Sequence, residues 1–216
     1  MAELSRRSML KLGVLGGIAG SAATAAGGSY LPELNPTPSE IKGPFYPIVA
    51  QKDKDFDLTK INGKDEAAKG TVIMIQGTVL DTDGNPVPDA TVDLWQANAE
   101  GRYNHPHDRN DAPLDPNFQG WAVVPSGEKG GFRFKTIFPG VYPAAKDWMR
   151  PPHIHYKVSQ RGYIELITQM YFPGHELKDK DLLLQHKGKK EQKLMIATEF
   201  DTEPTTYKYN IVLQEA

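Results

Sequence analysis

The feature that most constrains the fold is a series of short segments in which apolar and polar residues alternate. β-Branched and aromatic residues dominate these segments, and a period of two is typical of strands that bury one face. Turn residues separate them, and the 216 residues include 20 glycines and 17 prolines, which favours turns over long helices. The segments cover residues 71–81, 91–97, 130–137, 153–159, 166–172, 194–200 and 206–213. They predict an all-β sandwich or barrel built from residues 71–216.

The other stretches are predicted to be mostly irregular. Residues 26–70 are rich first in proline and then in charged residues, and we expect them to form an N-terminal arm that wraps the domain. Residues 98–130 form the longest irregular stretch, and a loop of that length in a compact domain tends to be functional. Only residues 179–188 have the pattern of a short helix, and a further helical turn is allowed in the arm.

The first 25 residues have the pattern of an export signal. Paired Arg6 and Arg7, followed by Lys11, precede a mildly apolar stretch rich in glycine and alanine. That stretch is shorter than the roughly 20 apolar residues of a membrane span, so no membrane span is expected. The arginine pair resembles the bacterial twin-arginine signal, with cleavage predicted after Ala25. We therefore expect export by the twin-arginine route to the periplasm.

Charge and cysteine content exclude several classes of function. The chain carries 25 basic and 27 acidic residues, which become 22 and 26 without residues 1–25, so the net charge changes from −2 to −4. A mildly acidic protein lacks the basic surface on which nucleic-acid binding depends, so no nucleic-acid partner is expected. The absence of cysteine excludes disulfides, thiolate ligands and a cysteine nucleophile.

The segment "VYPAAKDWMRPPHIHYKV", residues 141–158, carries the clearest candidate site. His153 and His155 are two positions apart, so in a strand their side chains share one face, while Ile154 and Tyr156 point to the other. One apolar face and one face with two imidazoles favour a metal ion at the histidines. Histidines spaced in this way are nonetheless more often structural than metal-binding.

Two tyrosines would complete a ligand set if they lie near these histidines. Tyr142 precedes the histidine pair in the same segment, and Tyr103 lies in the long loop. A phenol has a pKa of about 10, so only a strong Lewis acid keeps it ionised at neutral pH. Ferric iron meets that demand best, and two phenolates with one hydroxide would balance its charge. Tyrosines at strand ends are usually core residues, however, and a zinc or copper site that uses the histidines alone is an alternative.

Five segments resemble, in order, the intradiol ring-cleavage dioxygenases. They are "LWQANAEGRYNH", "APLDPNFQGW", "FRFKTIFPGVYP", "RPPHIHY" and "LITQMYF". The likeness covers residues 77–172, keeps the family's spacing between the tyrosine and histidine segments, and is greatest to the iron-bearing β chains of the protocatechuate 3,4-dioxygenases. The resemblance implies a two-sheet β-sandwich with long loops and one or two short helices, which agrees with the strand pattern.

The resemblance also implies a site and a reaction. The implied ligands of a non-haem ferric ion, Fe(3+), are Tyr103, Tyr142, His153 and His155. Arg150 would lie beside the bound substrate, and Gln169 would contact the metal ligands without binding the metal itself. Tyr142, Arg150 and Gln169 would then act in catalysis. The implied reaction is cleavage of a small-molecule catechol by O2 to a cis,cis-muconate-type diacid. In it Tyr142 takes a substrate proton and Arg150 stabilises developing negative charge.

Two positions near the pocket depart from the family pattern. Ala144 stands where protocatechuate enzymes commonly have tryptophan, and Pro152 stands where alanine is expected. Neither change removes a ligand, but both leave the identity of the catechol open. Trp95, on the strand before Tyr103, is expected either to line the pocket or to belong to the core.

A second His-x-His pair, His105 and His107, lies in the long loop. Pro106 and the loop setting leave the orientation of this pair undefined. We expect both histidines to be exposed and to have no role, because exposed loop histidines need none.

The sequence leaves two functions open. The first is a ferric intradiol dioxygenase. The second is a non-catalytic β-sandwich that binds a ligand or serves as the companion subunit of a dioxygenase complex, since "GTVLDTDGNPVPDATVDLW" alone would suit a transthyretin-like binding module. Retention of all four candidate ligands favours the enzyme, because a companion does not need them. The sequence decides neither between a homo-oligomer and a hetero-oligomer nor whether the export signal is removed.

Overall fold

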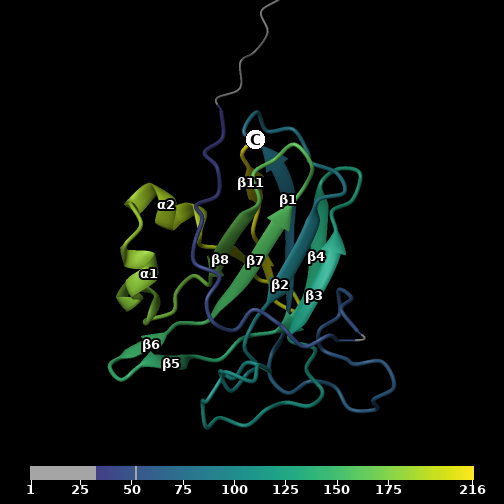
Figure 1. Cartoon of the computed structure of the whole chain (residues 1–216), viewed down its shortest axis with the longest axis vertical. Helices are drawn as coiled ribbons and strands as arrows, with labels where there is room; N and C mark the ends of the chain where they lie inside the picture. Colours follow the sequence, from purple (N-terminus) through teal and green to yellow (C-terminus); the bar gives the residue numbers. More distant parts are fainter. Residues whose placement is uncertain (1–32, 52) are drawn as a thin grey trace, which may run out of the picture. The chain divides into compact units, whose positions relative to one another are not determined.

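Two β-sheets account for most of the strands and pack face to face (Figure 1). The computed structural model describes residues 33–51 and 53–216, so the signal predicted for residues 1–25 lies outside the described residues. The strands are β1 (Val72–Asp81), β2 (Thr91–Trp95), β3 (Trp121–Pro125), β4 (Gly131–Ile137), β5 (Tyr142–Ala145), β6 (Trp148–Arg150), β7 (His153–Ser159), β8 (Leu166–Tyr171), β9 (Thr198–Phe200), β10 (Thr206–Lys208) and β11 (Ile211–Leu213). The predicted fold class, an all-β sandwich with short helices, is confirmed.

The first sheet contains five strands and is organised around β1. Strand β4 pairs with β1 in antiparallel fashion. On the other side of β1 lie β10 and β11, both parallel to it, and β9 extends the sheet beyond β10. The single strand predicted for residues 206–213 is therefore two. The chain leaves the ladder between them, where the side chain of Asn210 accepts a hydrogen bond from the backbone N–H of Thr78.

The second sheet contains β3, β2, β7 and β8 in that order, all antiparallel to their neighbours. Its register places Trp95 of β2, His155 of β7 and Gln169 of β8 side by side. One row away, His153 lies opposite Tyr171. Directly paired residues of antiparallel strands point to the same face, and so do residues two apart in one strand. These five side chains therefore share one face of the second sheet.

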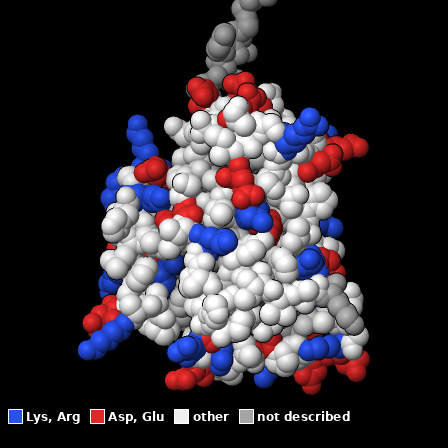
Figure 2. Space-filling view, viewed as in Figure 1, with Lys and Arg blue, Asp and Glu red and all other residues white. Residues whose placement is uncertain are grey.

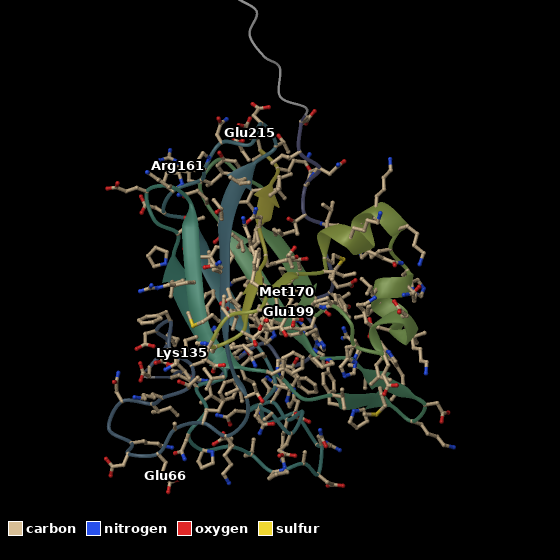
Figure 3. The ribbon with its side chains drawn as sticks, turned by 180° about the vertical axis from the view of Figure 1, so that it is seen from behind. Glu66, Lys135, Arg161, Met170, Glu199 and Glu215 are labelled. Carbon is tan, nitrogen blue, oxygen red and sulfur yellow. The ribbon has the colours of Figure 1, made fainter. Side chains whose placement is uncertain are left out.

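The opposite face of this sheet forms the main core with the first sheet. Ile154, Tyr156 and Val158 of β7 are fully buried there, together with Phe134 of β4. Burial of one such side chain is worth about 1.5–3 kcal/mol. Figure 3 shows the sandwich from behind, with the buried Met170 of β8 near its middle. The alternation along β7 thus sends its apolar residues to the core and its histidines to the outer face.

Three segments differ from the prediction. Residues 98–130 are not irregular throughout, because β3 pairs along the whole of β2. Strands β5 and β6 form an additional hairpin before β7. Of the strand predicted for residues 194–200 only the last three residues form β9, whereas Leu194 ends a helix. Ile196 makes a single bridge with Tyr171. A short apolar run has the same pattern in a strand and in a buried helix end, which is why periodicity misplaced it.

The helical part of the chain follows β8. It comprises a 3-10 turn (Lys178–Lys180), α1 (Leu182–Gln185) and α2 (Lys189–Leu194). The helix predicted for residues 179–188 corresponds to α1 and its flanking turns. Asp181 caps α1, because its side chain accepts a hydrogen bond from the backbone N–H of Leu184. Both helices lie along the β8 side of the sandwich, above the hairpin of β5 and β6 (Figure 1).

Residues 33–51 and 53–70 contain no helix and make only an isolated bridge, at Asp57. Backbone hydrogen bonds tie this segment to the sandwich, from Thr37 to Val212 and from Leu58 to Lys135. The division of the chain at residues 25 and 70 stays a prediction.

Acidic and basic side chains are interspersed on the face shown in Figure 2, where no broad basic area appears. This distribution agrees with the small net charge of −2. Within the part of the chain that the structure describes, no helix has both the length and the apolar character needed to cross a membrane.

Candidate metal centre

Two tyrosines and two histidines meet on the outer face of the second sheet. The ring centroids are 5.5 Å apart for Tyr103 and Tyr142, 5.6 Å for Tyr142 and His153, and 4.9 Å for His153 and His155. The hydroxyl of Tyr103 lies 3.4 Å from Nε2 of His153. None of the four side chains is more than 6% exposed. The four predicted ligands therefore form one buried cluster.

Two glycines bring the tyrosine segments together. Gly101 has a φ of +79° and lies so close to Val141 that a Cβ on it would be 2.0 Å from the carbonyl oxygen. The N–H of Gly140 donates to the carbonyl of Asn98 at 2.9 Å, and a Cβ there would lie 2.4 Å from a backbone oxygen. Only glycine allows so close an approach of two backbones. Each glycine stands two residues before a tyrosine of the cluster, so their contact sets the tyrosines side by side.

The histidines are held as neutral imidazoles. Nδ1 of His153 donates to the carbonyl of Pro151 at 2.7 Å, which leaves Nε2 as an acceptor. His155 stacks on Trp95 with 4.8 Å between ring centroids, and its buried Nδ1 has no hydrogen-bond partner among the described residues. Burial, together with the nearby charge of Arg150, lowers the pKa of both histidines well below the usual value. Neutral imidazole is the form that binds metal.

The phenols need a cation before they can ionise. Burial raises the pKa of Tyr103 well above the usual value, and the neighbouring Tyr142 adds to the shift. Burial also raises the pKa of Tyr142, against the opposing charge of Arg150. Within residues 33–51 and 53–216, no three His, Cys, Asp or Glu side chains gather as metal ligands. The cluster of two neutral imidazoles and two buried phenols fits a hard, highly charged cation, which would offset the cost of ionising the phenols.

Arg150 is buried beside this cluster, although an arginine is usually a surface cation. It is the cross-strand partner of Tyr142 in the β5–β6 hairpin. Its Nε donates to Asp181 at 2.6 Å, and its Nη2 donates to Gln169 at 2.6 Å and to the hydroxyl of Tyr171 at 3.0 Å. Burial opposes the positive charge, but Tyr171, Tyr142 and Asp181 outweigh it and raise the pKa of Arg150 above its ordinary value. Arg150 therefore keeps its positive charge, and it is paired with the buried carboxylate of Asp181.

Gln169 joins the cluster to the N-terminal arm. Its side-chain oxygen accepts from Arg150, and its Nε2 donates to the carbonyl of Ile41 at 3.0 Å. It also lies directly beside His155 in the sheet. The structure thus places all of the predicted site residues in one region.

The arm covers the cluster from outside the sheet. The ring of Phe45 lies 4.8 Å from that of Tyr103, and the ring of Tyr46 meets Trp95 edge-on at 4.9 Å. Trp95 is 1% exposed, so it both borders the cluster and belongs to a core of its own with the tyrosines. These aromatic rings cover part of the tyrosine side of the site.

Sequence reasoning missed Asp181 and Tyr171. Asp181 comes directly before the apolar run "LLL", which is the pattern of a helix N-cap. That pattern reveals the cap but not the contact with Arg150. Tyr171 stands two residues after Gln169 on the same strand, so its place on the same face was available from the alternation.

The prediction that His105 is exposed was wrong. Its side chain is only 8% exposed, and its ring lies 5.9 Å from Phe45. The loop folds back because Asp108 accepts the backbone N–H of Tyr103 at 2.7 Å, which carries His105 inward. His107 is exposed as predicted.

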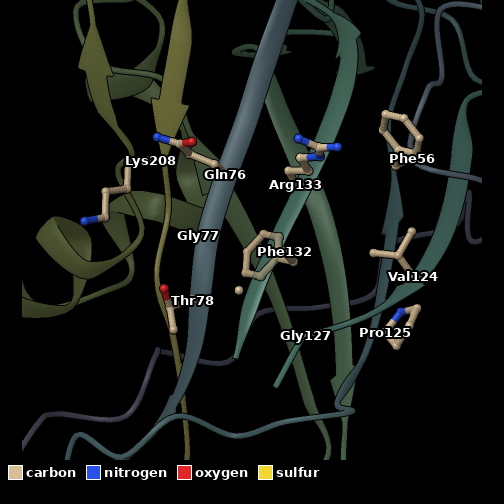
Figure 4. A pocket seen from close by; sticks show the side chains of 11 residues that line it. Phe56, Gln76, Gly77, Thr78, Val124, Pro125, Gly127, Phe132, Arg133 and Lys208 are labelled. Atoms are coloured by element: carbon tan, nitrogen blue, oxygen red, sulfur yellow. The ribbon is translucent and has the colours of Figure 1, made fainter. Parts of the chain in front are cut away.

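A surface groove of about 610 Å³ lies between β1, β3 and β4. Phe56, Phe132 and Arg133 line it, with Lys208 at one side (Figure 4). None of the predicted site residues lines this groove, so it is separate from the candidate metal centre.

Known proteins resemble this chain over most of its length. The family model described as "Dioxygenase" matches residues 41–215. The protocatechuate 3,4-dioxygenase beta chain of Burkholderia cepacia is 37% identical over 192 residues, which is 83% of this chain and 81% of that protein. This chain belongs to the intradiol ring-cleavage dioxygenase family. The family resemblance expected from the five segments is thereby confirmed.

Further members of the family match this chain over different shares of their own length. A catechol 1,2-dioxygenase of Acinetobacter baylyi is 30% identical over 65% of this chain and 47% of that protein. Among solved structures, a dioxygenase domain from Streptomyces sp. SirexAA-E superposes with a TM-score of 0.64 at 25% identity, covering 84% of this chain and all of that one. A catechol 1,2-dioxygenase of Acinetobacter sp. ADP1 superposes with a TM-score of 0.62 at 26% identity, covering 83% of this chain and 63% of that one.

Proposed function

We propose that the protein is a ferric-iron-dependent intradiol dioxygenase that cleaves a catechol-type ring with O2 to a cis,cis-muconate-type diacid. The observation that carries the proposal is the buried cluster of Tyr103, Tyr142, His153 and His155. A companion subunit without catalysis would have no use for such a cluster, and burying four polar groups without a ligand is costly.

The four side chains of the cluster would hold the iron. Two ionised phenols balance two of its three positive charges, and the neutral imidazoles add donors without adding charge. Bound there, ferric iron would supply a strong Lewis acid that favours ionised catechol oxygens and polarises the ring for reaction with O2. A zinc site is the weaker alternative, because zinc prefers thiolate, imidazole and carboxylate ligands.

Tyr142 and Arg150 would act on the substrate. Tyr142 is less enclosed than Tyr103 by the arm and sits beside Arg150, so as a phenolate it is suited to take one proton from a catechol hydroxyl. Arg150 would stabilise the negative charge that develops on the substrate, an effect that is worth several kcal/mol in other enzymes when the donor is held in place. Gln169 would hold Arg150 in that position.

The substrate class that we propose is a small catechol. Relatives are described as acting on protocatechuate, hydroxyquinol, catechol and chlorocatechol. Ala144 lies exposed on the β5–β6 hairpin, and Pro152 is buried directly before His153. A small side chain at position 144 leaves room at the hairpin, so substituted catechols belong in the panel of substrates tested.

The proposal is tested with the purified protein. We expect about one iron per chain, a wine-red colour from charge transfer between tyrosinate and iron, and a change of that colour on adding catechol under nitrogen. In air, oxygen electrode measurements should show one O2 consumed per catechol with a muconate-type product. Rates over catechol, protocatechuate, hydroxyquinol and chlorocatechol would identify the substrate. A colourless protein that binds zinc or copper, or one that takes up no oxygen with any of these, would overturn the proposal.

We also propose that the protein is exported to the periplasm by the twin-arginine route. The support is the Arg6–Arg7 pair ahead of a short apolar stretch. Fractionation of cells that produce the wild-type chain and an Arg6→Lys, Arg7→Lys variant tests this. Accumulation of the variant, but not of the wild type, in the cytoplasm is expected, and equal distribution would contradict the proposal.

A further inference from the structure

Asp181 is a fully buried carboxylate whose contacts all lead to the candidate metal centre or to helix α1. One oxygen accepts from Nε of Arg150 at 2.6 Å, in an ion pair whose side chains are 4% and 0% exposed. The other oxygen accepts from the hydroxyl of Tyr171 at 3.0 Å and from the backbone N–H of Leu184 at 3.0 Å. Both oxygens are therefore engaged, and the carboxylate has a defined position.

This carboxylate limits the ways in which Arg150 can lie. A guanidinium group is planar and presents its donors in a rigid fork. Nε is held by Asp181, and Nη2 is held by Gln169 and Tyr171. Nη1 is engaged by none of these three residues. Arg150 stands beside Tyr142 in the hairpin, and a hydrogen bond between the two side chains lowers the pKa of the phenol. With two of its three nitrogens fixed, the plane of the group is fixed, and Nη1 is the nitrogen left to meet a ligand.

We propose that Asp181 is a positioning residue for ring cleavage, which holds Arg150 so that its third nitrogen, Nη1, meets negative charge developing on the substrate. This role rests on the proposed function. The pair also makes helix α1 part of the site, because the same carboxylate caps that helix. Gln169 alone would leave the guanidinium free to rotate about a single hydrogen-bonded nitrogen, whereas the ion pair adds a second fixed nitrogen.

The test is the Asp181→Asn variant, assayed by steady-state kinetics per bound iron. Asparagine retains an oxygen that can cap α1, but it removes the charge and places an amide N–H₂ beside a guanidinium donor. Because the interaction is needed mainly in the transition state, kcat should fall about 10- to 100-fold with KM changed less than about 3-fold. The tyrosinate-to-iron absorption should stay as in the wild type, since no ligand of the cluster is altered.

A double-mutant cycle separates positioning from general stability. If Asp181 acts through Arg150, then Asp181→Asn should cause no further loss of kcat/KM in an Arg150→Met background. Asp179→Asn is the matched control, because Asp179 lies two residues away with a side chain 78% exposed, and its rates should equal those of the wild type.

This role would be overturned if the losses of kcat/KM in the two single variants multiply in the double variant, or if kcat of Asp181→Asn lies within 2-fold of the wild type. Either result would leave the proposed function standing. A wild-type protein that cleaves no catechol would overturn both.

Discussion

Replacement of Gly101 by alanine tests how the tyrosine segments are brought together. Gly101 has a φ of +79°, and a Cβ on it would lie 2.0 Å from the carbonyl oxygen of Val141. Alanine pays about 1–2 kcal/mol for the left-handed backbone alone. In addition, real Cβ atoms essentially never approach another heavy atom within 3.0 Å, so the two segments must move apart by about 1 Å. A displacement of that size at a reacting group costs up to about 100-fold in rate.

The matched control is Gly63→Ala. Gly63 has a similar φ of +84°, but nothing lies within 4 Å of the position of its Cβ. Unfolding in urea should show a loss of about 1–2 kcal/mol for Gly63→Ala and a larger loss for Gly101→Ala. Only Gly101→Ala should also weaken the tyrosinate-to-iron absorption, because it moves Tyr103 relative to Tyr142. If the two variants are equally stable and equally coloured, the close approach at Gly101 does not position the tyrosines.

Three further changes test other parts of the structure. Tyr103→Phe should lower iron affinity by more than about 10-fold and remove much of the visible absorption. The control is Tyr156→Phe, which removes a buried hydroxyl without a hydrogen-bond partner among the described residues and should leave iron content and stability unchanged. Equal iron content in the two variants would argue against phenolate ligation. Phe45→Ala removes a ring that packs on Tyr103. We expect a loss of about 2 kcal/mol in the free energy of unfolding and faster release of iron to a chelator. An unchanged rate of iron release would show that the arm does not enclose the site. Burial opposes ionisation of Asp57, but hydrogen bonds from Thr59 and the ion pair with Lys135 together outweigh it and lower the pKa of Asp57. The contribution of Asp57 to stability is therefore present above about pH 4 and is lost as the pH falls further. Asp57→Asn should therefore cost less than about 1 kcal/mol at pH 7 and flatten the acid limb of urea unfolding measured against pH, and an unchanged limb would contradict this.

The strands that could be predicted from the sequence are those with a sustained alternation. Segment 153–159 has it, and β7 begins and ends at those residues. β3 was missed because its five residues, "WAVVP", follow a long polar stretch, although Gly120 and Ser126 bound it as turn residues. Residues 194–200 were assigned to a strand because an apolar run has no period that distinguishes a helix end from an edge strand.

Some residues of the candidate site can likewise be placed from the sequence, and others cannot. The spacing of His153 and His155 predicts their common face, because that depends only on the pleat of one strand. The inward turn of His105 was not predictable, since it depends on a hydrogen bond from the loop backbone to Asp108. The contact between Arg150 and Asp181 joins residues from a hairpin and a helix cap, and no local pattern reports it.

By itself the sequence determined the local conformations and the chemical groups that are present. These are alternating strands, turn residues, two imidazoles on one face, phenols without thiolates, and the order of segments typical of the family. The tertiary structure decided which groups meet. Gly101 and Gly140 set two tyrosines together, and the fold buries an arginine against a carboxylate from a helix cap. The physical reason is that strand and turn preferences act over a few neighbouring residues, whereas contacts between distant residues depend on how loops pack around the sheets.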